Sequence, residues 1–217
     1  MLTLIATPIG RIDEITFRSV ELLKKADVVI CESTKETSKL LKQLEIKVQK
    51  YELLNEHSTP DEVKALADLC QKFNVVLVSD CGTPSFCDPG FQLVKICRQN
   101  KTPIQTSLGA SSLMGLLSLS SQQIHQFLFR GFIPAENSAR EKEWHSLKKI
   151  KEPIVLMDTP YRLKKMLDEC CIHLPHRQIL LVLNLSQENE AVYEGTPDKV
   201  RSSLAADKAE FMILVYA

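Results

Sequence analysis

The stretch Val75-Val76-Leu77-Val78-Ser79-Asp80-Cys81-Gly82-Thr83-Pro84 places a polar loop directly after an apolar run. Such a run is typical of a central parallel strand that helices cover on both faces. The loop carries an acid, a glycine and a hydroxyl side chain within five residues. Because a carboxylate at the end of a buried strand is costly unless it is paired or contacts a ligand, Asp80 is a candidate site residue.

Strand-like runs alternate with helical patterns on both sides of this stretch. Strands are expected at residues 2–6, 28–31, 48–51 and 104–107, with helices between them. This alternation predicts an open, mostly parallel α/β sheet. Ligands of such sheets bind beyond the carboxyl ends of the strands, which is where residues 79–84 are expected.

A second α/β unit is predicted after a polar, helix-poor segment at residues 120–125. We therefore divide the chain into an N-terminal domain, residues 1–118, and a C-terminal domain, residues 119–217. Residues 191–193 and 210–216 are expected to form a terminal strand pair in the second domain.

The composition is that of an ordinary globular protein. The 217 residues are 44% hydrophobic and 25% charged, with zero formal net charge, so there is no global electrostatic attraction to nucleic acid. No apolar run approaches the roughly 18–20 residues of a membrane helix, and the start lacks a basic leader. Seven cysteines without a CxxC pair argue against a disulfide framework or a metal site. A cytoplasmic location is expected.

Two further loops follow predicted strands. They are Ala6-Thr7-Pro8-Ile9-Gly10 and Leu108-Gly109-Ala110-Ser111-Ser112. Taken alone, the first is a strand–helix turn and the second supplies a serine cap to a helix. No GxGxxG or GxxxxGK[ST] motif occurs, which disfavours a nucleotide phosphate site. Asp88, before Pro89, is as well suited to starting a helix as to chemistry.

Together, these loops resemble those of the tetrapyrrole methylase superfamily, and in particular its ribosomal RNA (cytidine-2′-O)-methyltransferase branch. Further segments match that branch in the same order along the chain. They are Glu32-Ser33-Thr34-Lys35, Asp88-Pro89-Gly90, Gly131-Phe132-Ile133-Pro134, Asp158-Thr159-Pro160-Tyr161-Arg162 and Tyr193-Glu194-Gly195-Thr196.

The resemblance implies two α/β domains with S-adenosylmethionine in the cleft between them, usually in a homodimer. Carried over residue by residue, it implies cofactor contacts in both domains. These contacts are Ile9, Asp80, Thr83, Ser111 and Ser112 in the first domain, and Met157 and Thr159 in the second. Adenosylmethionine has no phosphate, which agrees with the missing phosphate motifs.

Methyl transfer to a ribose also needs a proton acceptor and contacts to RNA. Glu32 or Asp80 is a candidate base, and Lys35 would stabilise negative charge or hold a phosphate. Arg11 and Arg162 are the candidate substrate contacts. Solvated surface positions remain the alternative for each of these side chains.

Several positions depart from the branch. Arg11 stands where it has asparagine, Ser33 where it has aspartate, and Leu183-Asn184-Leu185-Ser186-Gln187 loses a charge pair. The departures alter the presumed substrate side more than the cofactor side. Three hypotheses follow: a methyltransferase of small-subunit ribosomal RNA, a methyltransferase of a small molecule such as a tetrapyrrole, or a non-catalytic adenosylmethionine-binding module.

Overall fold

The computed structural model describes residues 1–48 and 50–217. The chain divides into two compact units, Met1–Ser111 and Ser112–Ala217. The strand expected at residues 48–51 falls partly on residue 49, which lies outside the described residues. The strand of that region is β3, Tyr51–Leu53.

The first unit contains a five-stranded parallel sheet, as the strand–helix alternation predicted. Its strand order is β3-β2-β4-β1-β5, so β4 lies at the centre. Besides β3, the strands are β1 (Leu2–Ile5), β2 (Val28–Cys31), β4 (Val75–Val78) and β5 (Ile104–Ser107).

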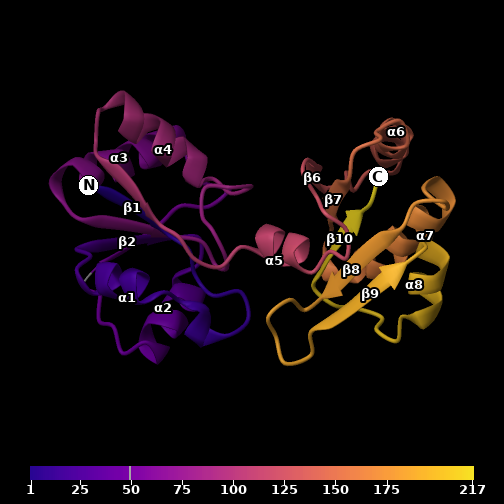
Figure 1. Cartoon of the computed structure of the whole chain (residues 1–217). Helices are drawn as coiled ribbons and strands as arrows, with labels where there is room; N and C mark the ends of the chain where they lie inside the picture. The colour runs from indigo at the N-terminus through magenta and orange to yellow at the C-terminus, as the bar shows by residue number, and fades with distance from the viewer. Residues whose placement is uncertain (49) are drawn as a thin grey trace. The chain divides into compact units, whose positions relative to one another are not determined.

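Helices cover both faces of this sheet (Figure 1). On one face Val76 and Val78 of β4 pack with residues of α1 (Phe17–Lys24) and α2 (Thr34–Gln43). On the other face Val75 and Leu77 pack with α3 (Pro60–Lys72) and α4 (Gly90–Gln99). All four β4 residues are buried, which explains why this strand is apolar on both faces. A short 3₁₀ turn, η1 (Ile12–Glu14), precedes α1.

Local sequence signals fix where these helices begin. The Thr59 side chain accepts a hydrogen bond from the amide of Glu62, and the Glu62 carboxylate accepts one from the Thr59 amide, forming a capping box ahead of α3. Thr16 and Ser33 cap α1 and α2 through their side chains alone, which accept hydrogen bonds from the amides of Ser19 and Glu36. The helix that Ser33 starts leaves directly from the end of β2, so it carries its first turn to the carboxyl edge of the sheet.

The second unit contains a mixed five-stranded sheet of order β6-β7-β10-β8-β9. β6 and β7 are parallel, and the other neighbours are antiparallel. The strands are β6 (Leu128–Phe132), β7 (Ile154–Met157), β8 (Ile179–Leu183), β9 (Ala191–Gly195) and β10 (Phe211–Val215).

The expected terminal strand pair is wrong. β9 pairs with β8, whereas β10 lies between β7 and β8 in the middle of the sheet. All five β10 residues are apolar and buried, so a central position satisfies both of its faces.

Helices α6 (Asn137–Leu147), α7 (Leu163–His173) and α8 (Pro197–Ser203) cover one face of this sheet. A short turn, η2 (Pro160–Arg162), joins β7 to α7. The opposite face is covered by α5 (Ser112–Ser118), whose Leu116 packs with β8 and β10.

The units thus divide between Ser111 and Ser112, whereas the sequence placed the boundary after residue 118. The difference is α5, which follows β5 in the chain but packs its apolar face on the second sheet. In residues 1–48 and 50–217 no helix is long and apolar enough to cross a membrane.

Replacing Leu116 by alanine should destabilise the second unit. The side chain is fully buried, so its removal leaves a cavity that costs about 2–5 kcal/mol. The only tryptophan, Trp144, is buried in the same unit, and its fluorescence during urea unfolding reports that unit alone. Met114→Ala, on the same helix but 60% exposed, is the matched control and should change the unfolding free energy by less than about 0.5 kcal/mol. Equal effects of the two substitutions would contradict the assignment of α5 to this core.

Candidate functional site

Backbone hydrogen bonds join the loop after β1 to the loop after β4. The amide of Thr7 donates to the carbonyl of Gly82 at 2.9 Å, and the amide of Gly82 donates to the carbonyl of Thr7 at 3.0 Å. The Thr7 hydroxyl, which is buried, also donates to the carbonyl of Ser79 at 3.1 Å. The two loops are therefore held in register by three bonds rather than merely lying near each other.

The loop after β5 is attached to the same structure. The Thr83 hydroxyl donates to the carbonyl of Ala110 at 3.0 Å. Gly109 packs so closely that a Cβ atom there would lie 3.0 Å from Cβ of Ala6, and Gly82 has φ +77°, a conformation that favours glycine. The glycines of these loops thus permit the close approach of three chain segments at one edge of the sheet.

Two carboxylates from neighbouring strands meet at this edge. Glu32 follows β2 and accepts a hydrogen bond from the backbone amide of Asp80, whereas the Asp80 side chain accepts one from the backbone amide of Ser33. Burial raises the pKa of Glu32, and the charges of Asp88 and Asp80 raise it further. Burial also raises the pKa of Asp80, with an added contribution from the charge of Glu36.

Asp88 has a structural role. Its carboxylate accepts hydrogen bonds of 2.7 Å from the amides of Ser85 and Gly90, which hold the start of α4. Burial raises the pKa of Asp88, although these amides oppose the shift. Asp88 therefore organises the loop and adds negative charge near Glu32.

A hollow of about 370 Å³ lies beside these loops, and Asp80 is one of its lining residues. It brings together the loop after β1, the helix α2 and the end of β4. Its full lining is Pro8, Gly10, Ile12, Glu36, Lys39, Leu40, Gln43 and Asp80. The sequence analysis missed Glu36, Lys39 and Gln43, because nothing in an exposed polar helix indicates which face borders a hollow.

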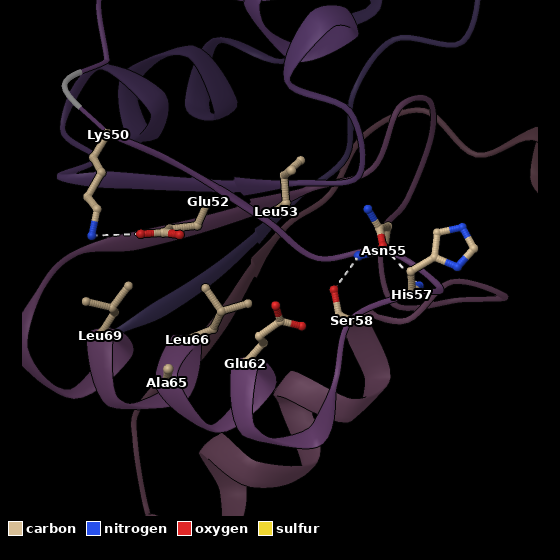
Figure 2. Close-up of a pocket in the computed structure, with 10 residues that line it drawn as sticks. All are labelled: Lys50, Glu52, Leu53, Asn55, His57, Ser58, Glu62, Ala65, Leu66 and Leu69. Carbon is tan, nitrogen blue, oxygen red and sulfur yellow. Dashed lines mark hydrogen bonds and ion pairs between the residues drawn. The ribbon is translucent and has the colours of Figure 1, made fainter.

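A larger cavity of about 480 Å³ lies elsewhere, between the edge strand β3 and helix α3 (Figure 2). Leu66 and Leu69 form part of its wall, and an ion pair of 2.7 Å joins Lys50 to Glu52 across its rim. None of the site residues predicted from the sequence lines this cavity, so size alone does not locate the predicted site.

The remaining predicted residues of the first unit surround the joined loops. The amide of Ile9 donates to the Glu14 carboxylate at 3.3 Å, and Ile9 is half-buried. Arg11 lies at the start of η1 and Lys35 in the first turn of α2, both exposed. Ser111 is the last residue of this unit.

Two of the four predicted residues of the second unit are hydrogen-bonded to a buried aspartate, Asp158. Oδ1 of Asp158, directly after β7, accepts hydrogen bonds from the amide of Thr159 at 2.8 Å and from Nη1 of Arg162 at 3.1 Å. Oδ2 accepts a bond of 2.9 Å from Nη1 of Arg140. Asp158 thereby fixes two predicted site residues, although the sequence analysis gave it no role of its own. Met157 is half-buried at the end of β7, and Ser112 begins α5.

Arg140 connects three elements of this unit from a fully buried position on α6. Its Nε and Nη2 atoms donate to the Glu169 carboxylate of α7, and Nη1 also donates to the carbonyls of Ile133 and Pro134. Burial opposes the charged form, but the hydrogen bonds that Arg140 donates to Glu169 and Asp158, together with the charges of these two carboxylates, outweigh it and raise the pKa of Arg140. The sequence did not single out this residue, because it is an arginine at an inward position of α6, one turn before the buried Trp144 and two turns before the buried Leu147.

No group of three or more His, Cys, Asp or Glu side chains suited to a metal ion occurs among the residues that the structure describes.

Arg140→Ala should destabilise the second unit by roughly 3–5 kcal/mol, because it leaves the Glu169 carboxylate and one oxygen of the buried Asp158 carboxylate without their cation. Unfolding followed by Trp144 fluorescence measures the loss. Arg201→Ala is the matched control: Arg201 also pairs with a carboxylate of α7, that of Asp168, but its side chain is 33% exposed and that of Asp168 is 54% exposed. Its cost should be about 0–1 kcal/mol, and a similar loss for both variants would argue against a buried network.

Comparisons with known proteins agree with this geometry. The family model for Tetrapyrrole (Corrin/Porphyrin) Methylases matches residues 1–200. A Leptospira biflexa protein named ribosomal RNA small subunit methyltransferase I is 33% identical over 216 residues, covering 99% of this chain and 90% of its own length.

Two solved structures share the fold. One is a cobalt precorrin-4 methyltransferase, with TM-score 0.70, 18% identity, and coverage of 99% of this chain and 94% of its own. The other is a uroporphyrin-III C-methyltransferase of Thermus thermophilus in complex with S-adenosylhomocysteine, with TM-score 0.64, 16% identity, and coverage of 98% and 96%. The chain belongs to the tetrapyrrole methylase family and is an S-adenosylmethionine-dependent methyltransferase.

Proposed function

We propose that this protein methylates the 2′-hydroxyl of a ribose in small-subunit ribosomal RNA. The observation that carries the proposal is the position of Glu32, whose carboxylate accepts a hydrogen bond from the Asp80 amide at the edge where three loops are hydrogen-bonded together. The Leptospira relative named as a ribosomal RNA small subunit methyltransferase supports the choice of substrate. The ribose hydroxyl as acceptor rests on the sequence resemblance.

The residues present fit S-adenosylmethionine, which supplies the methyl group when bound. Gly82 and Gly109 let the three loops pack against one another, which brings their polar groups to the edge of the sheet where a ligand would bind. The Asp80 carboxylate complements its positive sulfonium and ammonium groups. We assign the binding to Ile9, Asp80, Thr83, Ser111, Ser112, Met157 and Thr159.

Glu32 is the proposed general base. A hydroxyl that accepts a methyl group must lose its proton, and a base within hydrogen-bonding reach assists that loss. The raised pKa of Glu32 makes its carboxylate a stronger proton acceptor than an ordinary surface glutamate. Holding the acceptor oxygen in line with the methyl group and the sulfur atom lowers the activation barrier further, by up to roughly 7–11 kcal/mol in favourable cases.

Local cations take the place of a basic overall charge in this proposal. Lys35, three residues after Glu32, is assigned to a phosphate next to the acceptor ribose. Arg11 and Arg162 are assigned to phosphates further along the RNA. The homodimer that the sequence resemblance implies is also proposed, and sedimentation of the purified protein tests it.

The decisive experiment is transfer of a labelled methyl group from S-adenosylmethionine to small ribosomal subunits from a strain that lacks this protein. Label is expected on a ribose of the small-subunit RNA. Small molecules, tetrapyrroles included, serve as parallel acceptors. Label on these alone would replace the RNA proposal, and cofactor binding without transfer to any acceptor would favour a non-catalytic module.

Asp80→Ala should weaken the binding of S-adenosylmethionine by about tenfold or more, since it removes a carboxylate that faces a cation. Isothermal titration calorimetry of the purified protein measures the affinity. Asp68→Ala, an exposed acid on α3, is the control and should bind the cofactor normally. Unchanged affinity in Asp80→Ala would reject the assignment of Asp80.

Glu32→Gln should reduce the rate of methyl transfer by about 10²–10⁴-fold while leaving cofactor affinity nearly unchanged. Glutamine still accepts the Asp80 amide bond but takes up no proton. In the native protein the rate should rise with pH until Glu32 is deprotonated, and its raised pKa moves this rise above the range of an ordinary glutamate. A rate profile between pH 4 and 9 checks this, and persistence of the same acidic limb in Glu32→Gln would assign it to another group.

A further inference from the structure

The most exposed aromatic ring of the second unit stands on its most firmly anchored turn. Tyr161 is 78% exposed, in the middle of η2. Pro160 restricts the backbone before it. On either side of these residues, the Thr159 amide and the Arg162 guanidinium are both bonded to the buried Asp158. The ring is therefore presented to solvent from a backbone with little freedom to move.

One face of the ring is occupied by a cation. Nζ of Lys208 lies 3.7 Å from the ring centroid, within the range of a cation–π interaction. Hydrogen bonding and charge from the same ammonium group lower the pKa of Tyr161. The contact occupies one side of the ring, and the residue as a whole is still 78% exposed.

The side chains around the ring are mostly basic. Arg162 uses one Nη1 bond to Asp158 and is still 34% exposed, and Lys165 contacts the neutral side chain of Asn137. Lys164 is paired with Asp207. Arg140 is shared between Asp158 and Glu169, so Arg162 completes the charge balance of this cluster, and its exposed part retains N–H donors for a further acceptor. An exposed ring with one cation over its face and an arginine next to it in the chain fits a flat ligand that carries negative charge at its edges.

We propose that Tyr161, supported by Lys208, is a stacking site for an unpaired RNA nucleobase, with Arg162 contacting the adjoining phosphate. Unstacked bases of single-stranded RNA bind to exposed aromatic rings in this way, and arginine binds the backbone phosphate between them. The inference rests on the proposed RNA substrate and adds where and how that RNA is held.

The test uses the full-length protein and a single-stranded RNA of about twelve nucleotides with a central 2-aminopurine, whose fluorescence falls when it stacks. The native protein should bind this probe and quench it. Tyr161→Leu keeps an apolar side chain without a π face, so binding should weaken by about 5- to 100-fold and the quenching should be lost. Tyr161→Phe should retain both.

Two controls separate stacking from general effects. Phe17→Leu removes an aromatic ring that is 94% exposed in the first unit, and it should bind the probe as the native protein does. Arg162→Gln should reduce the salt dependence of binding by about one phosphate contact without abolishing the quenching. Thermal unfolding of each variant verifies that it is folded.

Failure of this inference is distinguishable from failure of the proposed function. If the native protein does not bind the probe, or if Tyr161→Leu binds and quenches as the native protein does, the stacking site is wrong even where ribosomal RNA is methylated. If no RNA is methylated but Tyr161→Leu still weakens binding, the stacking site stands and the proposed reaction is wrong.

Discussion

Burial of β4 on both faces is the constraint on which the first unit depends. Since its four residues are covered by helices on each side, polar chemistry is confined to the end of the strand. There the Thr7–Gly82 backbone pair ties the loop after β4 to the loop after β1. The geometry of the site therefore depends on the sheet, because a change in the packing of β4 would move both the Asp80 amide that donates to Glu32 and the Asp80 carboxylate that accepts from the Ser33 amide.

An aspartate follows a buried strand in both units, but it has a different role in each. Each has a buried strand followed by an aspartate, Asp80 after β4 and Asp158 after β7. Asp158 is buried and fully paired with Arg140 and Arg162, which makes it an internal anchor. Asp80 is largely exposed and accepts a hydrogen bond from the Ser33 amide, while partial burial and the charge of Glu36 raise its pKa. The Asp80 carboxylate therefore leaves negative charge available to a positively charged ligand, whereas the Asp158 carboxylate does not.

The sequence predicted those parts of the fold that follow from local residue patterns. It did not predict the parts that depend on contacts with residues far away in the chain. The parallel sheet and the three loops follow from apolar runs, glycines and strand order in the first unit. The central position of β10 could not be predicted, because an apolar run does not specify its neighbours. The same reason explains why α5 was assigned to the wrong unit: it packs on a sheet whose strands come later in the chain. Arg140 shows the limit most clearly, since only the fold reveals that a residue of a charged helix is buried.

The absence of net charge restricts how this chain would hold the RNA that we propose as its substrate. Electrostatic binding grows with the number of phosphates neutralised, and a chain with 27 basic and 27 acidic residues has few uncompensated cations to offer. Much of the binding energy must then come from contacts that do not release counterions, of which base stacking is the strongest available. An exposed ring beside a few cations supplies such a contact at little cost to solubility. The rigid turn that Asp158 holds matters for this reason, because a fixed ring loses less conformational entropy on stacking than a mobile one.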